Sequence, residues 1–341
     1  MSRYPRGCED WLAATYCDAW FYAGGLENYP RLVDRMAGIR PLWGVRGVAL
    51  RHVRSPWRLG RLLRQYGLHF PETQCATASS ARIGELDDRH LYKPLKSCGG
   101  ANISRAAPVD DGRRYVRQAF CAGESHSAIF VSNGRRVELV GVTRQLIGES
   151  WTCASPFQYC GSIGPVTLPP ATTDVVQRVG EAVGIGMQVY GWFGLDFVLH
   201  GEQMCTIEVN PRYTASIEVL ERSFNASILQ MHVDACTSGE FSSAPSGEDA
   251  PVLGKAIVYA PGRCEIESIT FDELWQMRVS TEVCGGPRVA DIPRCGDRFT
   301  AGAPLLTLFS AASHYNEARQ ILQNDVAKIY EILKASSPGA A

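Results

Sequence analysis

The residues best suited to chemistry lie at the end of a predicted β-hairpin that covers residues 192–209, with a Gly-containing turn between its strands. Because strand side chains alternate between the two faces of a sheet, Asp196 lies on the polar face of the first strand. Glu208 and Asn210 lie together on the polar side of the second. Three oxygen ligands on adjacent strands suit a hard cation such as Mg²⁺, which also takes oxygens from substrate phosphates. The alternative is a hairpin whose polar face is only solvated.

A cation and a loop of small residues precede this hairpin in the chain. Lysine is rare here: the chain has five, and two of them fall in the tetrapeptide 93–96. Lys93 belongs to a predicted strand, 90–95, that leads into a loop containing Gly99 and Gly100. An ammonium in this position can contact phosphate oxygens while backbone N–H groups of the loop close over them. The P-loop pattern is absent, and an ordinary exposed hairpin is the alternative.

Composition excludes several classes of function. The formal net charge of −1 and a sequence pI near 6.7 leave no electrostatic footprint for nucleic acid or an anionic membrane. We find neither an apolar run of about eighteen residues nor a signal-peptide pattern at the N-terminus, and we therefore expect a soluble cytoplasmic protein. The twelve cysteines are spread singly, without a C-x-x-C pair, which favours reduced, mostly buried thiols.

Apolar periodicity predicts the elements that must position these side chains. The tetrapeptide 24–27, Gly-Gly-Leu-Glu, lies where a strand gives way to a helix, and it either faces a ligand or forms a tight βα turn. The predicted strands are 19–23, 42–45, 115–120, 127–131 and 137–143. The predicted helices are 29–37, 56–66, 172–183 with a Thr/Asp cap, 213–236 and 316–333, and a polar linker covers 239–249.

The order of these parts resembles the ATP-grasp superfamily, in which ATP lies between two α+β subdomains. The resemblance covers roughly residues 50–235. It rests on the lysine-bearing strand, the glycine loop, and an acid followed twelve residues later by Glu-x-Asn, then Pro-Arg. Within the superfamily the chain is most similar to the carboligase-type branch related to biotin carboxylase and to ligases of methanofuran- and tetrahydromethanopterin-linked cofactor pathways. The motifs Gly-Leu-Glu-Asn-x-Pro, Phe-Pro-Glu-Thr and Ile-Glu-Val-Asn-Pro-Arg carry that finer resemblance.

The resemblance implies which residues meet the nucleotide. Lys93 would contact the phosphates of ATP and take part in catalysis. Gly99 and Gly100 would form the covering loop. The segment 117–127 is similar to the hinge of the superfamily, where Gln118 and Glu124 would lie near the nucleotide.

The same resemblance assigns the metal and the reacting group. Asp196, Glu208 and Asn210 would bind Mg²⁺ or Mn²⁺. Arg212 would be catalytic, stabilising negative charge on an acyl phosphate or on the substrate carboxylate. Two positions depart from the family pattern. A second ATP-binding lysine is replaced in the stretch 55–58 by Arg58, and Ser216 stands where biotin carboxylases carry a glutamate.

The fold class expected is therefore α+β: an ATP-grasp fold with a short α/β pre-grasp domain and a small C-terminal β domain. The expected boundaries are 1–78 for the pre-grasp domain, 79–238 for the ATP-grasp domain, 250–312 for the β domain, and 313–341 for a helix and tail. Within the ATP-grasp domain the lid would cover about 79–117 and the metal-binding half about 118–238.

The activity implied by the resemblance is an ATP- and Mg²⁺-dependent carboxylate–amine ligase that forms an amide through an acyl phosphate, in one-carbon cofactor biosynthesis. Its partners would be small-molecule carboxylates and amines, with neither nucleic acid nor membrane, and a homodimer stays open. Two alternatives also stay open: an ATP-dependent carboxylase, and a catalytically silent nucleotide-binding grasp module.

Overall fold

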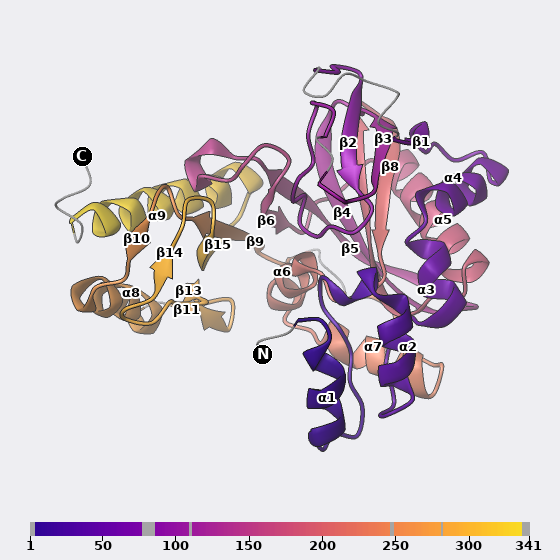
Figure 1. The fold of residues 1–341 in the computed structure, drawn as a ribbon, viewed down its shortest axis with the longest axis horizontal. Coiled ribbons are helices and arrows are strands. Elements are labelled where there is room, and N and C mark those ends of the chain that lie inside the picture. The colour runs from indigo at the N-terminus through magenta and orange to yellow at the C-terminus, as the bar shows by residue number, and fades with distance from the viewer. Residues whose placement is uncertain (1–3, 77–85, 109–110, 246–248, 281, 336–341) are drawn as a thin grey trace. The chain divides into compact units, whose positions relative to one another are not determined.

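The computed structural model describes residues 4–76, 86–108, 111–245, 249–280 and 282–335. The chain divides into two compact units, shown as a ribbon in Figure 1. Unit 1 comprises Met1–Val142, Thr167–Ile217 and Ser227–Ala244, and unit 2 comprises Thr143–Val166, Glu218–Ala226 and Pro245–Ala341. All the site residues expected from the sequence fall in unit 1.

The main sheet of unit 1 has the strand order β5-β4-β7-β8, with antiparallel pairing of β4 with β7 and of β7 with β8. Its strands are β4 (Glu124–Asn133), the first part of β5 (Val137–Ile147), β7 (Tyr190–His200) and β8 (Gln203–Asn210). The hairpin predicted across 192–209 is thus confirmed as β7–β8. The Asn133-Gly134 turn joins β4 to β5.

Helices cover both faces of this sheet. Neighbouring residues of β7 point to opposite faces, so each of the next two residues contacts a different helix. Phe193 stacks on Phe130 of β4, with ring centroids 5.1 Å apart, on the side of α5 (Pro170–Gly186). Trp192 stacks on His232 of α7 (Ile228–Thr237), with centroids 3.8 Å apart. Gly180 allows α5 to lie close to Phe130 on the other face, since a Cβ at this position would lie 2.3 Å from a ring carbon of Phe130.

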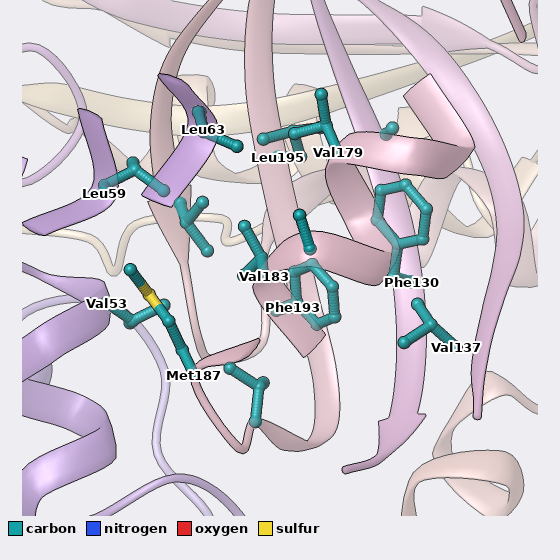
Figure 2. Packing of buried hydrophobic residues seen from close by; sticks show 14 of the residues in the cluster. Val53, Leu59, Leu63, Phe130, Val137, Val179, Val183, Met187, Phe193 and Leu195 are labelled. Atoms are coloured by element: carbon teal, nitrogen blue, oxygen red, sulfur yellow. The ribbon is translucent and has the colours of Figure 1, made fainter. Parts of the chain in front are cut away.

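A single hydrophobic core joins α5 to the N-terminal helices of unit 1. Figure 2 shows Val183 of α5 beside Phe193 and Val179 beside Leu195, with Leu63 nearby. Burial of such side chains contributes about 1.5–3 kcal/mol each. The N-terminal elements are α1 (Gly7–Ala14), the short 3-10 helix η1 (Leu26–Asn28), α2 (Pro30–Ala37), α3 (Gly47–Val53) and α4 (Pro56–Gln65).

A separate three-stranded sheet carries the lysine and the glycine loop. Its order is β1-β3-β2, with β1 (Thr73–Cys75), β2 (His90–Pro94) and β3 (Tyr115–Ala119). All pairs are antiparallel. The loop that contains Gly99 and Gly100 follows β2, and a four-residue connector, 120–123, leads from β3 into β4.

Unit 2 contains a sheet of order β13-β15-β9-β6-β5, to which β5 contributes its second part. The long helix α9 (Tyr315–Ala335) packs on β9 (Val252–Tyr259) and β15 (Pro304–Ala312). Its buried face repeats at helical spacing through Ala318, Leu322, Val326, Ile329 and Leu333. The remaining elements are η2 (Ser150–Thr152), β6 (Tyr159–Gly164), α6 (Ala215–Phe224, which begins in unit 1), β10 (Cys264–Glu265), α8 (Ser268–Ser280), β11 (Glu282–Val283), β12 (Gly286–Pro287), β13 (Val289–Ala290) and β14 (Arg298–Phe299).

Several predicted elements differ from the structure. The strands expected at 19–23 and 42–45 reduce to one parallel bridge between Trp20 and Leu42, and the surrounding residues form loops. The single helix expected over 213–236 is two, α6 and α7, because Asn225 adopts a left-handed φ of 48° and the next helix is capped by Ser227. The expected Thr/Asp cap of α5 is wrong, since that helix begins at Pro170.

The expectation of reduced, mostly buried thiols is confirmed in part: ten of the twelve cysteines are free, but two form a disulfide and few are buried. Cys121, in the connector between β3 and β4, forms a disulfide with Cys205 of β8. Among the free cysteines of the described residues, only Cys8 and Cys160 are buried, while Cys75, Cys98 and Cys295 are exposed. Cysteine spacing along a chain does not reveal which pairs the fold brings together, so neither feature could be found from sequence. Within the described ranges the structure contains no helix long and apolar enough to cross a bilayer.

Candidate functional site

The two carboxylates expected to bind a cation face each other across β7 and β8. Asp196 pairs with Glu208 and Gly194 pairs with Asn210, and a register shift follows directly after Asp196. The Asn210 amide joins the pair, because its Nδ2 donates to Asp196 Oδ2 at 2.9 Å and to Glu208 Oε1 at 3.2 Å. The predicted alternation is confirmed: Leu195 and Val209 of the same strands lie in the hydrophobic core.

This proximity changes the acidity of both groups. Burial, followed by the negative charge of Glu208, raises the pKa of Asp196 to about 7. Glu208 shifts the other way: although burial disfavours its charged form, the positive charges of Lys93 and Arg54 and the hydrogen bond from Asn210 lower its pKa. The Glu208 side chain is only partly enclosed and keeps 42% of its surface exposed, so this carboxylate is open to a ligand. A cation between the two carboxylates would relieve their repulsion.

Lys93 approaches the carboxylates from the three-stranded sheet. Its Nζ donates to Gln118 Oε1 at 3.0 Å, and Gln118 Nε2 in turn donates to Thr73 Oγ1 at 3.1 Å. Burial lowers the pKa of Lys93, while the nearby charges of Glu208 and Asp196 favour its protonated form. The amide of Gln118 therefore orients the ammonium, and the structure brings these two predicted residues together.

Arg212 lies directly beyond Asn210 and is held by several partners. Its Nε donates to Glu27 Oε1 at 2.7 Å, its Nη1 to the Tyr213 carbonyl at 3.0 Å, and its Nη2 to Asn210 Oδ1 at 3.2 Å. The Glu27 side chain is fully buried. The turn 24–27 faces Arg212, since a Cβ at Gly24 would lie 3.6 Å from Arg212 Cζ.

Sequence reasoning missed Arg54, which supplies another positive charge here. Its Nη1 lies 4.0 Å from Glu208 Oε2, and its Nη2 donates to Asn28 Oδ1 at 3.2 Å. Asn28 also reaches the glycine loop, donating from Nδ2 to the Ser97 carbonyl at 3.2 Å. Arg58, which occupies the stretch where the family pattern has a lysine, is exposed on α4. The rarity of lysine drew attention to Lys93, but no comparable signal distinguishes Arg54 among so many arginines.

The remaining predicted residues are Gly99 and Gly100 in the loop after β2 and Glu124 at the start of β4. Gly99 and Gly100 adopt left-handed φ angles of 62° and 76°, which only glycine enters at little cost, so the loop conformation depends on them. Glu124 is exposed at the start of β4, three residues before Ser127, which pairs with Asp196. Three residues of strand span about 10 Å, so the structure does not bring Glu124 to the carboxylate pair.

The donor set fits a hard divalent cation. Among the described residues no group of three or more histidine, cysteine and carboxylate side chains gathers to hold a metal. A cation here would therefore be held by Asp196, Glu208 and an amide oxygen, together with phosphate and water, which is the usual composition of a Mg²⁺ site. Asn210 presents Nδ2 to the carboxylates, so coordination through its Oδ1 requires the amide to turn.

Comparison with known proteins shows which domain family the chain is similar to. Residues 53–216 match the family model of the ATP-grasp domain. The large chain of carbamoyl phosphate synthase from Kocuria rhizophila is 24% identical over 159 residues, which are 42% of this chain and 14% of that protein. The chain thus matches a small part of this curated relative.

Solved structures show the same fold. The L-amino acid ligase from Bacillus licheniformis superposes with a TM-score of 0.67 at 17% identity, covering 89% of this chain and 77% of that one. The biotin carboxylase domain of the Hydrogenobacter thermophilus 2-oxoglutarate carboxylase, solved with MgADP and bicarbonate, gives 0.67 at 14% identity, covering 93% and 75%. The chain therefore has the ATP-grasp fold, an α+β architecture, and the expectation of that fold is confirmed.

Proposed function

We propose that this protein is an ATP- and Mg²⁺-dependent carboxylate–amine ligase that works through an acyl phosphate and releases ADP. One observation carries the proposal: Lys93, the pair Asp196 and Glu208 with Asn210, and Arg212 converge within one unit although the sequence separates them widely. Phosphoryl transfer needs these parts, namely cations on the phosphates and carboxylates that hold a metal ion. The likeness to an L-amino acid ligase supports C–N bond formation.

The residues of the chain would act chiefly by position and charge. Lys93, oriented by Gln118, would bind phosphate oxygens of ATP. Asp196, Glu208 and Asn210 would hold Mg²⁺, which would supply positive charge to neutralise the phosphates. A carboxylate oxygen of the substrate attacks the γ-phosphorus, and the bond from that phosphorus to ADP breaks. Arg212 would stabilise the negative charge of the substrate carboxylate or of the acyl phosphate formed from it. The amine then attacks the carbonyl carbon, loses a proton, and expels phosphate.

The proposed substrate class and pathway rest on the less specific sequence motifs. We infer that the carboxylate is an amino acid or a pathway intermediate, and that the reaction belongs to one-carbon cofactor biosynthesis, as in methanofuran- and tetrahydromethanopterin-linked pathways. The glycine loop with Gly99 and Gly100 would cover the phosphates, while Gln118 and Glu124 would lie near the nucleotide. A homodimer is the assembly we propose to test.

The decisive assay measures ADP and phosphate with Mg²⁺-ATP and paired carboxylates and amines, including amino acids and aromatic amines. We expect ADP and phosphate only when both substrates are supplied. Glu208→Gln and Lys93→Met should each lower turnover about 100-fold or more, because each removes a group that acts on charge in the transition state. Lys328→Met, an exposed lysine on α9, is the matched control and should retain activity.

Other products would identify the alternatives. Release of AMP and pyrophosphate would rule out the acyl phosphate. ADP release that depends on bicarbonate would favour the carboxylase reading, which the bicarbonate-bound structural neighbour makes worth testing. ATP binding by calorimetry without turnover under every mixture would indicate a silent module. Unchanged turnover in Glu208→Gln would remove the proposed metal site.

A further inference from the structure

We propose that Glu27 is a positioning residue for the reaction: it holds the guanidinium of Arg212 in an ion pair of its own, so that Arg212 faces the reacting group and does not pair with the carboxylates Asp196 and Glu208. The inference deepens the proposed function and rests on it for the role of Arg212. It assigns a function to the tetrapeptide 24–27, which otherwise reads as an ordinary turn.

Glu27 uses both of its carboxylate oxygens at this position. Oε1 accepts from Arg212 Nε at 2.7 Å, and Oε2 accepts from the backbone N–H of Gly25 at 2.5 Å. The Glu27 side chain is fully buried, and the Arg212 side chain keeps 11% of its surface exposed. A buried carboxylate with two fixed donors has little freedom, so the orientation of Arg212 follows from that of Glu27.

The other contacts of Arg212 fix the plane of the guanidinium without neutralising it. Nη1 donates to the Tyr213 carbonyl and Nη2 to Asn210 Oδ1, both uncharged acceptors. Nη2 also donates to Cys98 Sγ at 3.8 Å. Since an arginine has five N–H groups, these bonds and the Glu27 bond use four of them, and the N–H left for an anionic substrate lies on Nη1.

The glycines of the turn are required for this close approach. A Cβ at Gly24 would lie 2.7 Å from Cys98 Sγ and 3.6 Å from Arg212 Cζ. Gly25 has a φ of +108°, a conformation that L side chains rarely adopt, and its N–H is the one that binds Glu27. The Gly-Gly-x-Glu sequence therefore places the carboxylate of Glu27 in direct contact with Arg212.

A competing arrangement explains why the negative charge of Glu27 matters. Asn210 links Arg212 to the pair, because its Oδ1 accepts from Arg212 Nη2 while its Nδ2 donates to Asp196 and Glu208. Without Glu27, we expect Arg212 to pair with these carboxylates one hydrogen-bonded residue away. Such a pairing would occupy the oxygens that the metal needs and would turn the guanidinium away from the substrate.

The test compares Glu27→Gln and Glu27→Asp with Glu9→Gln. Glu9 is the matched control, because it forms an exposed pair with Arg35 at 2.9 Å in the same unit. The readouts are kcat and KM with Mg²⁺-ATP, Mg²⁺ affinity by calorimetry, and the ¹⁵N-resolved NMR signal of the Arg212 Nε–H, identified by its loss in Arg212→Lys. Thermal unfolding checks that each variant is folded.

We expect Glu27→Gln to lower kcat about 10- to 100-fold, with KM for ATP changed less than about threefold, since mispositioning costs rate rather than nucleotide binding. The Arg212 Nε–H signal should shift, and Mg²⁺ should bind about threefold or more weakly. Glu27→Asp, which keeps the charge, should recover part of each loss. An unshifted Nε–H signal in folded Glu27→Gln, or equal effects in Glu9→Gln, would overturn the proposal.

The NMR and Mg²⁺ measurements need no substrate, so they decide the inference even if no turnover is found. In that case the proposed function would fail while the role of Glu27 toward Arg212 would still be judged. If Glu27→Gln does not fold, the same criteria apply to Glu27→Asp: an Nε–H signal and kcat identical to the parent protein would refute positioning, because the shorter side chain cannot keep both of its bonds.

Discussion

The facing carboxylates Asp196 and Glu208 allow us to predict how the stability of the metal-free protein depends on pH. Asp196→Asn removes one of two facing carboxylates and keeps a side chain of nearly the same shape. We expect this change to stabilise the protein in EDTA at pH 8, although it removes a residue proposed to bind metal. The reason is that the folded protein holds Asp196 beside Glu208, where burial and the neighbouring charge oppose its ionisation.

The sign and size follow from the pKa of Asp196, which is 3.8 ordinarily and about 7 in the folded protein. Between these values the folded state binds more protons than the unfolded state, so this group contributes stability below pH 3.8 that is lost as the pH rises through 7. Each pKa unit corresponds to about 1.4 kcal/mol, and solvent access and sharing of the proton with Glu208 reduce the total, which gives about 2–4 kcal/mol.

The assay is urea unfolding followed by tryptophan fluorescence in EDTA at pH 5 and pH 8. Because only the interval from pH 5 to the folded pKa of about 7 contributes, the stability of Asp196→Asn relative to the parent should rise by about 1–2.5 kcal/mol between these conditions. Addition of Mg²⁺ at pH 8 should raise the stability of the parent and have less effect on the variant. Glu9→Gln is the control: Glu9 is paired with Arg35 at 2.9 Å, and the hydrogen bond from Arg35 lowers its pKa, so its loss should act alike at both pH values. A relative stability of Asp196→Asn that is the same at pH 5 and pH 8 would refute the reasoning.

Two further predictions concern the fold. Gly180→Ala should cost about 1–3 kcal/mol in unfolding free energy, because its Cβ would overlap the ring of Phe130; Gly186→Ala, whose Cβ would meet a neighbouring side chain at 3.1 Å, should cost less, and equal costs would contradict the packing argument. Burial lowers the pKa of His232 from 6.5 to about 4. Between these pH values His232 is mostly neutral in the folded protein and mostly protonated in the unfolded chain. Stability should therefore fall by up to about 3 kcal/mol as the pH drops from 6.5 to 4, and His232→Gln should flatten that dependence in chemical denaturation.

Much of the site could be predicted because its signals are local. Asp196, Glu208 and Asn210 are arranged by strand alternation, a period that the sequence displays directly, and the structure places them on one face. Lys93 stood out because lysine is rare, and its strand was predicted with an error of one residue. Helices α4 and α9 were likewise predicted within one or two residues, because each carries a clear apolar face.

The rest depends on contacts between distant residues. Glu27 meets Arg212 across 185 positions, and Arg54 approaches Glu208 from the end of a short helix, so neither partner could be identified from spacing. The apolar run 19–23 failed as a strand because its residues pack against helices and loops, where burial needs no ladder of hydrogen bonds. In each case tertiary packing overrode local preference.

The disulfide between Cys121 and Cys205 has a consequence for the covalent topology of the chain. It closes a ring over a separation of 84 residues, which includes Asp196, whereas Glu208 lies three positions outside it. While the bond is intact, a single backbone cut anywhere between 122 and 204 leaves one molecule rather than two fragments. Even a nicked chain would thus keep both proposed metal carboxylates tethered together until a reductant opens the ring.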